Sequence, residues 1–254
     1  MRILVGTSGW QYDDWRGVLY PEGLPKRAWL THLATRFPTV EVNSSFYRLP
    51  SAGTFGRWRA ETPEGFVVAV KASRFITHVR RLRDCREPVE LLWSRARELG
   101  NRLGPVLFQL PPSFIVDLDR LRELLSVLPH GLRGAFEFRD PSWGIAPVFR
   151  LLDAAGAAFV QADRVGPSTP NVVTGGWSYV RLHQGSETEP GYSRAALERW
   201  ADRIAALDAF EVFVYFNNDT GGAAVRDAIT LTELLAARAV GAPRTRRWRP
   251  RDGA

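Results

Sequence analysis

Glutamate and arginine alternate with phenylalanine in the segment GAFEFRD, which spans residues 134–140. Neighbouring residues of an extended chain point to opposite faces, so Glu137 and Arg139 share one face and Phe136 and Phe138 share the other. Charges that lie close to an apolar core must be desolvated and paired, which is costly unless they serve a purpose. The two charged residues are therefore candidates for a functional site, in which we expect Arg139 to hold Glu137 ionised.

Two other segments carry polar side chains at the same alternating spacing. Glu41 and Asn43 alternate with valine in VEVNSS (40–45), and Arg181 and His183 alternate with apolar residues in YVRLHQ (179–184). Imidazole changes its charge near neutral pH, and a carboxylate can act as a base or orient one. We therefore predict Glu137, His183 and Glu41 as the catalytic groups.

Strands must position these residues, and strand-like segments recur eight times along the chain. They span residues 2–10, 39–47, 66–73, 105–113, 134–140, 157–164, 177–185 and 210–219. Apolar residues at helical spacing separate most of them, but residues 165–176 hold two prolines and three glycines and predict a loop after the sixth segment. Alternating strands and helices imply a parallel sheet. We predict an α/β fold, a (β/α)8 TIM-like barrel that forms a single domain over residues 1–240, with the helix after strand six missing or degraded.

Polar residues gather near the late ends of these segments, where barrels of this kind place their active sites. The predicted substrate-binding residues are Lys71, Arg139, Arg181, Asn217, Asn218, Asn43, Gln109, Trp10, Tyr47, His78, Trp143 and Asp163. The cations in this set favour a phosphate or carboxylate. Gly221 and Gly222 would add free amides at a helix start. The aromatic side chains suit a sugar ring or a nucleobase, or alternatively pack the loops against one another.

Some of these residues could instead bind a metal ion. Glu41, Glu137 and Asp163, with His183 beside them, are oxygen and nitrogen ligands that could hold Mg²⁺ or Mn²⁺. Three cations of the predicted site compete for the same carboxylates. We therefore predict no cofactor and keep a divalent metal as the alternative.

Charge and composition limit the classes of partner. The net charge is +7, but residues 241–254 carry five arginines and one aspartate, and we expect this basic segment to be a disordered tail. A weak nucleic-acid contact through the tail is one possibility and a solvated appendage the other. The sequence has no long apolar run that would cross a membrane. The single cysteine, Cys85, excludes an internal disulfide, so we expect a cytoplasmic protein.

Seven segments, in order, resemble the family known as domain of unknown function 72, the YecE-like proteins. They are GTSGWQYDDWRGVLYP (6–21), EVNSSFYRLP (41–50), KASRFITH (71–78), LFQLPPSF (107–114), FEFRDPSW (136–143), YVRLHQG (179–185) and YFNND (215–219). The resemblance covers residues 2–235 and implies a TIM-like barrel. It implies no reaction, because the family is named for lacking one.

The residues together favour an enzyme that uses acid/base chemistry, by hydrolysis or isomerisation. Its substrate would be a small anionic molecule that bears a ring, such as a nucleotide, a nucleic-acid end or a phosphorylated sugar. A non-catalytic sensor of the same ligand class would need the same residues. A nucleic-acid-binding protein that uses the arginine-rich tail is the third hypothesis.

Overall fold

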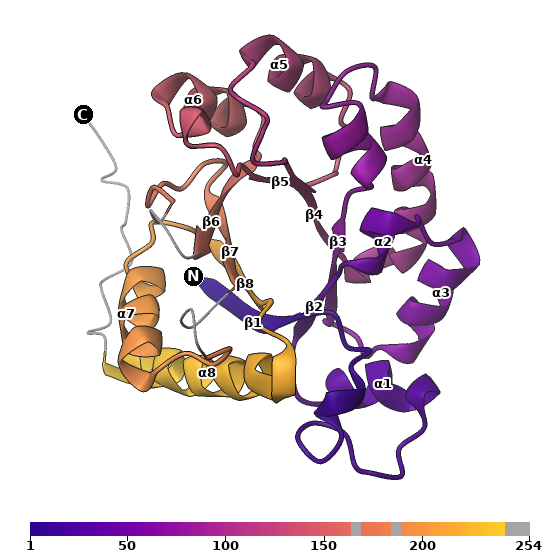
Figure 1. Cartoon of the computed structure of the whole chain (residues 1–254), viewed down its shortest axis with the longest axis vertical. Coiled ribbons are helices and arrows are strands. Elements are labelled where there is room, and N and C mark those ends of the chain that lie inside the picture. Colours follow the sequence, from indigo (N-terminus) through magenta and orange to yellow (C-terminus); the bar gives the residue numbers. More distant parts are fainter. Residues whose placement is uncertain (164–168, 184–188, 242–254) are drawn as a thin grey trace, which may run out of the picture.

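Eight parallel strands form a closed barrel in the order of the chain (Figure 1). The structure is a computed structural model that describes residues 1–163, 169–183 and 189–241. The strands are β1 (Arg2–Ser8), β2 (Thr39–Val42), β3 (Val67–Lys71), β4 (Leu103–Gln109), β5 (Gly134–Glu137), β6 (Ala158–Asp163), β7 (Trp177–Leu182) and β8 (Glu211–Phe216). The last strand closes the barrel, because β8 pairs with β1. The predicted α/β barrel is confirmed.

Helices surround the strands and cover their outer faces. They are α1 (Trp29–Leu33), α2 (Ser44–Tyr47), α3 (Ala52–Glu61), α4 (Arg86–Ala96), α5 (Leu118–Ser126), α6 (Ala146–Ala154), α7 (Arg194–Ala205) and α8 (Ala223–Gly241). Local signals explain where some begin: the Ser193 side chain accepts a hydrogen bond from the Ala196 amide and caps α7. Among the described residues no helix separates β6 from β7, as the proline and glycine pattern predicted.

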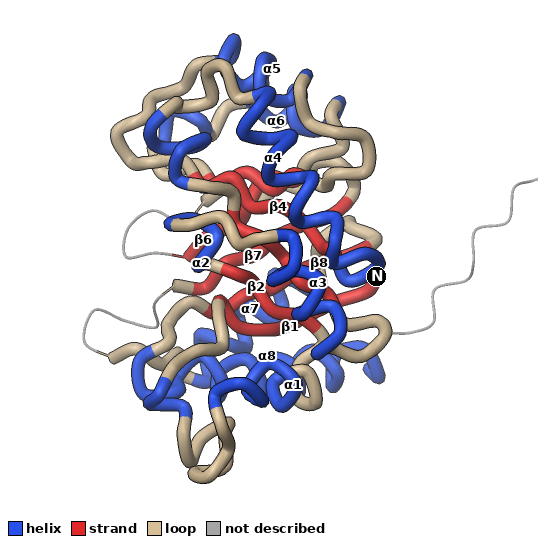
Figure 2. The backbone as a smooth tube through the Cα atoms, turned by 90° about the vertical axis from the view of Figure 1, so that its right-hand side faces the viewer, coloured by secondary structure: helices blue, strands red, loops and turns tan. Residues whose placement is uncertain are grey.

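Several strands are shorter than the sequence pattern predicted. The second was expected to run to residue 47 but ends at Val42, and the next residues turn into the short helix α2. A π-helical turn, Phe75–Val79, follows β3 in a similar way. These turns fold back over the carboxyl ends of the strands. In the side view of Figure 2, α2 lies at that end of the barrel and the N-terminus at the other.

Apolar residues fill two separate layers. The inner layer lies inside the barrel and includes Leu4, Leu107, Val160 and Phe213. The outer layer lies between strands and helices and includes Phe136 and Phe138, as their alternation with charged residues predicted. The barrel interior is a packed core, as expected for eight strands.

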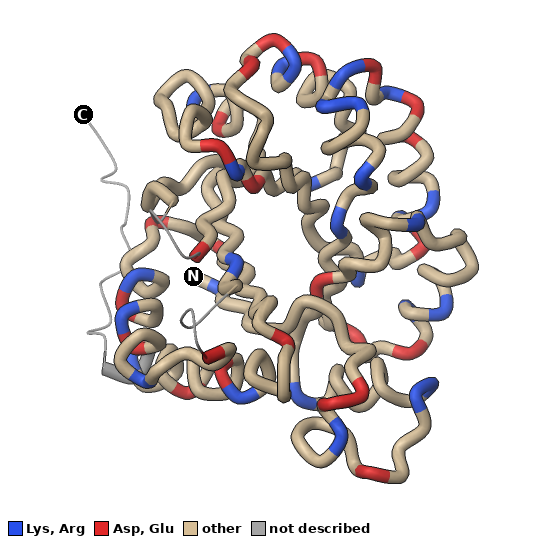
Figure 3. Tube along the Cα trace, viewed as in Figure 1, with Lys and Arg blue, Asp and Glu red and all other residues tan. Residues whose placement is uncertain are grey.

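The amino end of the barrel is closed by an arginine. The guanidinium of Arg133 lies 4.3 Å from the ring centroid of Trp177 and donates to Glu211 at 2.6 Å. Most other charged residues lie on the outer helices and loops, where acidic and basic positions are mixed (Figure 3). The remaining polar groups of the interior lie toward the carboxyl end.

Of the predicted basic tail, residues 242–254 lie outside the described residues, and Gly241 is the last residue of α8. No helix of the described chain is both long enough and apolar enough to cross a membrane.

Close packing of β1 against β2 makes a direct prediction at Gly6. A Cβ atom at this position would lie 2.1 Å from the backbone oxygen of Thr39, whereas a Cβ at Gly56, in helix α3, would meet no atom within 4 Å. We expect Gly6→Ala to lower the free energy of unfolding by about 3 kcal/mol or more. The matched control Gly56→Ala should raise it by about 0.5–1 kcal/mol. Urea unfolding of both variants checks this, and equal effects would contradict the packing argument.

Candidate functional site

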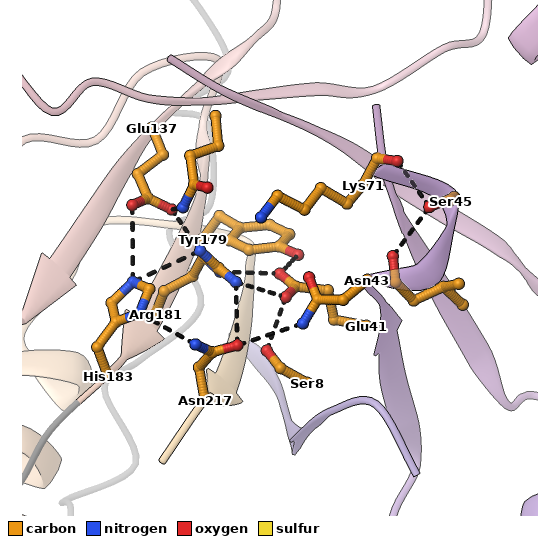
Figure 4. A network of polar contacts seen from close by, with 12 residues as sticks. Ser8, Glu41, Asn43, Ser45, Lys71, Glu137, Tyr179, Arg181, His183 and Asn217 are labelled. Carbon is orange, nitrogen blue, oxygen red and sulfur yellow. Dashed lines mark hydrogen bonds and ion pairs between the residues drawn. The ribbon is translucent and has the colours of Figure 1, made fainter. Parts of the chain in front are cut away.

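A buried arginine lies at the centre of the polar cluster at the carboxyl end of the barrel (Figure 4). The side chain of Arg181, on β7, is 1% exposed. Its Nε donates to Glu41 Oε2 at 3.0 Å and its Nη2 to Glu41 Oε1 at 2.7 Å, which is a two-pronged contact. Its Nη1 donates to Glu137 Oε2 at 2.6 Å. One guanidinium therefore joins β2, β5 and β7 across the barrel.

Each carboxylate also accepts hydrogen bonds from other strands. Glu41 accepts from Ser8 Oγ and from Tyr179 Oη, both at 2.6 Å. Glu137 accepts from Gln109 Nε2 at 2.9 Å. Both carboxylates are fully buried, and these donors replace the water that burial removes.

Arg139 contributes less to this pairing than the sequence suggested. We expected it to hold Glu137 ionised, but its Nε lies 3.4 Å from Glu137 Oε1 and its side chain is 30% exposed. Arg181 is the closer partner, at 2.6 Å. Arg139 therefore lies at the edge of the cluster, where it can meet a ligand from solution.

The charges of the cluster fix its protonation state. Burial by itself would raise the pKa of Glu41, but Arg181 and the donors around it bring that pKa below its ordinary value. Arg181 and His183 outweigh burial in the same way and hold the pKa of Glu137 well below the ordinary value. Burial and the charge of Glu41 raise the pKa of Tyr179 well above its usual range. Both carboxylates are thus ionised, and Tyr179 is a neutral donor.

His183 follows β7 and lies between Glu137 and Asn217. Its Nε2 is 3.6 Å from Glu137 Oε1, and its Nδ1 is 3.3 Å from the Nδ2 of Asn217. The Oδ1 of Asn217 accepts from Asn43 at 3.2 Å, so the amide nitrogen of Asn217 is the group that faces the imidazole. Nε2 also lies 3.5 Å from Nη1 of Arg181, so this nitrogen lies between a donor, the Arg181 guanidinium, and an acceptor, the Glu137 carboxylate.

Lys71 enters the cluster from the end of β3. Its Nζ lies 4.4 Å from the ring centroid of Phe46, and α2 is held against this strand by a 2.7 Å hydrogen bond from Ser45 Oγ to the Lys71 carbonyl. Burial and then the charge of Arg181 lower the pKa of Lys71 to about 8. The imidazole of His78 also packs edge-on against Phe46, with 5.0 Å between the ring centroids. Burial and the charge of Lys71 lower the pKa of His78.

Four residues of the predicted set lie elsewhere. Trp10 is buried against Trp58. Trp143 is fully buried and stacks on a core phenylalanine. Asp163 accepts from the indole of Trp200 on α7 at 3.2 Å. Asn218 donates to Asp227 on α8 at 2.7 Å. These corrections have one cause: the side chains point away from the barrel axis, into the layer between strands and helices.

The aromatic loop residues divide between the two expected roles. Trp10, Trp15 and Trp143 are buried and pack the loops against one another. Tyr47 is 82% exposed and meets Phe46 edge-on. Of the aromatic residues predicted to bind substrate, Tyr47 alone in the described chain offers a large exposed ring.

The glycine pair after β8 is not open to an anion as predicted. The amide of Gly221 donates to a carboxylate oxygen of Asp14 at 2.6 Å. The indole of Trp15 donates to the Asp219 carbonyl at 3.0 Å. The loop after β1 therefore already occupies this terminus.

The ligand set proposed for a metal is also dispersed. Asp163 lies outside the cluster, and Glu41 and Glu137 are both bound to Arg181. No group of three or more His, Cys, Asp or Glu side chains among the described residues is arranged to hold a metal ion.

Sequence reasoning missed three residues of this region. Ser8 and Tyr179 donate to Glu41, and both share the inward face of a strand with residues that were found, which was the available signal. Asp219 follows β8, and burial raises its pKa to about 7. No sequence pattern marked it, because its burial depends on the packing of the first loop.

Removing the Arg181 guanidinium should reverse the way in which the two buried carboxylates make the free energy of unfolding depend on pH. In Arg181→Met the buried carboxylates lose their main cation, so we expect a loss of about 3–5 kcal/mol of unfolding free energy at pH 7.5. Their pKa values should then rise above the unfolded value of about 4.3. As the pH falls toward 5, the folded variant would bind protons before the unfolded variant does. The difference in unfolding free energy between wild type and variant should therefore shrink. In wild type the lowered pKa values predict that this stabilisation is lost only on further acidification.

Urea unfolding at the two pH values measures this difference. Arg122→Met is the control. Arg122 lies on the exposed face of α5, and Asp119 is its ion-pair partner among the described residues, so this variant should change little at either pH. A deficit of Arg181→Met that grows on acidification would contradict the assigned charge states.

Comparisons with known proteins agree with the fold. The chain is 28% identical to the UPF0759 protein YunF of Bacillus subtilis (strain 168), over 92% of this chain and 94% of that protein. A DUF72 family protein of Thermotoga maritima MSB8 has a crystal structure with a TM-score of 0.84 and 28% identity, covering 93% of this chain and 100% of that one. A DUF72 family protein of Enterococcus faecalis V583 has the same fold, with a TM-score of 0.78 and 18% identity over 92% and 95% of the two chains. The family model described as protein of unknown function DUF72 matches residues 4–251, and the chain therefore belongs to the DUF72 family.

Proposed function

We propose that the carboxyl end of the barrel is the active site of an enzyme that performs acid/base chemistry on a small anionic substrate bearing a ring. One observation carries the proposal: Lys71, a cation beside the buried ion pairs, has no carboxylate oxygen within 4 Å among the described residues. Arg181 pairs with both buried carboxylates, and Arg139 lies at the edge of the same cluster. A structural brace alone needs no such additional cation, whereas an anion-binding site does.

The anion would be bound by the two cations at the edge of the cluster. Arg139 is 30% exposed, and its guanidinium is a planar group that can bind phosphate or carboxylate oxygens in pairs. Lys71 lies within 4 Å of no carboxylate oxygen among the described residues. A phosphate or carboxylate placed between these cations would be attracted by both positive charges.

Proton transfer would fall to His183. Its side chain is 14% exposed, so it can meet both solvent and substrate. Glu137 is close enough to stabilise the imidazolium form and to orient the ring. Glu41 and Glu137, whose oxygens already accept several hydrogen bonds, would act by holding Arg181 and His183 in place.

The ring of the substrate would lie toward α2. Tyr47 presents an exposed ring there, and Phe46 and His78 form the wall next to it. Stacking of this kind suits a nucleobase, while a sugar would use the same aromatic wall. Nucleotides, nucleic-acid ends and phosphorylated sugars share the required chemistry.

Anion binding can be measured without knowing the reaction. In thermal-shift titrations with inorganic phosphate and with nucleoside monophosphates, we expect wild type to gain about 2.7 kcal/mol at a ligand concentration of 100 Kd. Arg139→Gln removes one charge-assisted contact and should weaken binding about 10–100-fold. The control Arg122→Gln should bind like wild type. No stabilisation by any of these anions, or equal binding by both variants, would count against the site.

Substitution of His183 tests whether the protein is an enzyme or a non-catalytic sensor. With a turned-over ligand in hand, His183→Gln should lower kcat about 10²–10⁴-fold and leave anion affinity within about threefold of wild type. A ligand that binds at this end of the barrel without turnover in wild type would favour the sensor.

A further inference from the structure

Lysine is rare in this chain, and one of its two lysines lies in the proposed site. The sequence holds 32 arginines but only two lysines, Lys26 and Lys71. Lys26 is a surface residue, 60% exposed and paired with Asp13. A position that needed only positive charge is filled by arginine almost everywhere else in the chain. Lysine differs in one chemical respect, because its amine can lose a proton and become a nucleophile, which a guanidinium cannot.

The surroundings of Lys71 favour that neutral form. Its Nζ lies beside the Phe46 ring, with no carboxylate oxygen within 4 Å among the described residues. Arg181 repels its charge most strongly, Glu41 and Glu137 attract it, and Arg139 repels it to a smaller extent. His78, on the turn after β3, is the nearby titratable group on that side. Burial and the two arginines prevail, and with a pKa of about 8 about a quarter of the amines are neutral at pH 7.5.

Figure 4 shows the Lys71 side chain extending from β3 toward Tyr179 and Arg181, over the middle of the barrel end. An anionic substrate whose phosphate or carboxylate is bound by Arg139 would lie in this region. We propose that Lys71 is a nucleophilic amine that forms an imine with an aldehyde or ketone group of the anionic substrate. The proposal rests on the proposed function, since the same end of the barrel must bind the anion.

The step balances without a further reactant. The neutral amine of Lys71 attacks the carbonyl carbon, a C–N bond forms, and one amine proton passes to the carbonyl oxygen to give a carbinolamine. The imidazolium form of His183 then protonates the hydroxyl group, which leaves as water, and the remaining proton on nitrogen passes back to His183. The products are an imine and one water molecule, and hydrolysis reverses the step.

The two-lysine composition makes the test simple. Pyridoxal 5′-phosphate is a ring-bearing, phosphorylated aldehyde, and cyanoborohydride reduces any imine that it forms to a stable secondary amine. After a short incubation at pH 7.5, peptide mass spectrometry should find the reduced adduct on Lys71 in about tenfold excess or more over Lys26. Labelling should rise with pH through about 8, and inorganic phosphate should protect Lys71. Labelling of Lys26 equal to that of Lys71, or no protection by phosphate, would overturn the proposal.

Variants separate this inference from the proposed function. Lys71→Arg keeps the charge and should keep stabilisation by phosphate while losing the adduct, and Lys26→Arg should retain full labelling of Lys71. If wild type is stabilised by phosphate and Arg139→Gln is not, yet no adduct forms on Lys71, the imine is excluded and the anion site stands. If phosphate and nucleotides stabilise nothing, the proposed function itself fails.

Discussion

The contact between the Arg181 guanidinium and two buried carboxylates is the constraint on which the site depends. Taking three charges out of water costs several kcal/mol for each, and the cost is offset only when geometry and hydrogen bonding are nearly complete. Here Nε and Nη2 of the guanidinium donate to Glu41, and Nη1 donates to Glu137. Because these residues come from β7, β2 and β5, the barrel must keep its shape for the charges to stay paired. His183 and Asn217 take their positions from the same network.

The layers beneath the network explain why its charges act strongly. The inward residues change from apolar side chains at mid-barrel to hydroxyl groups and then to charges at the carboxyl end. Tyr215 and Thr39 share a hydrogen bond of 2.7 Å below Glu41, and Tyr179 links this level to the carboxylate. Water is thus excluded from one side of the cluster. Electrostatic effects grow in such surroundings, and the lowered pKa of Lys71 is one result.

Strand parity decided which site residues could be predicted from sequence. Where an apolar residue alternates with a polar one, as at Glu41, Glu137 and Arg181, the inward face was evident and the structure brings the polar residues together. Strand β6 also alternates, but its polar residues are on the outward face, where Gln161 and Asp163 accept hydrogen bonds from Arg203 and Trp200 of α7. Asp163 was therefore assigned to the wrong face, and Asn218, just after β8, was misassigned in the same way.

Loop conformation was beyond the reach of pattern reasoning. The tryptophans after β1 and β5 looked like ligand-stacking residues, but whether an indole faces solvent depends on contacts between distant loops, such as the hydrogen bond from Trp143 to the Phe114 carbonyl. The sequence also did not indicate which arginine forms the closest ion pair with Glu137. Sequence proximity suggested Arg139 for Glu137, whereas the closer partner, Arg181, lies on another strand.

The closure of the barrel has a consequence for how the chain folds during synthesis. β1 forms its longest ladder with β8, from Arg2 to Thr7, and the first and last loops are tied by Asp14 and Trp15. A ribosome therefore releases the first strand long before its partner exists. Until then an apolar strand edge stays unpaired, the state in which partly made chains aggregate. Long-range pairing of this kind slows folding, and β1 cannot complete this ladder until β8 has been made.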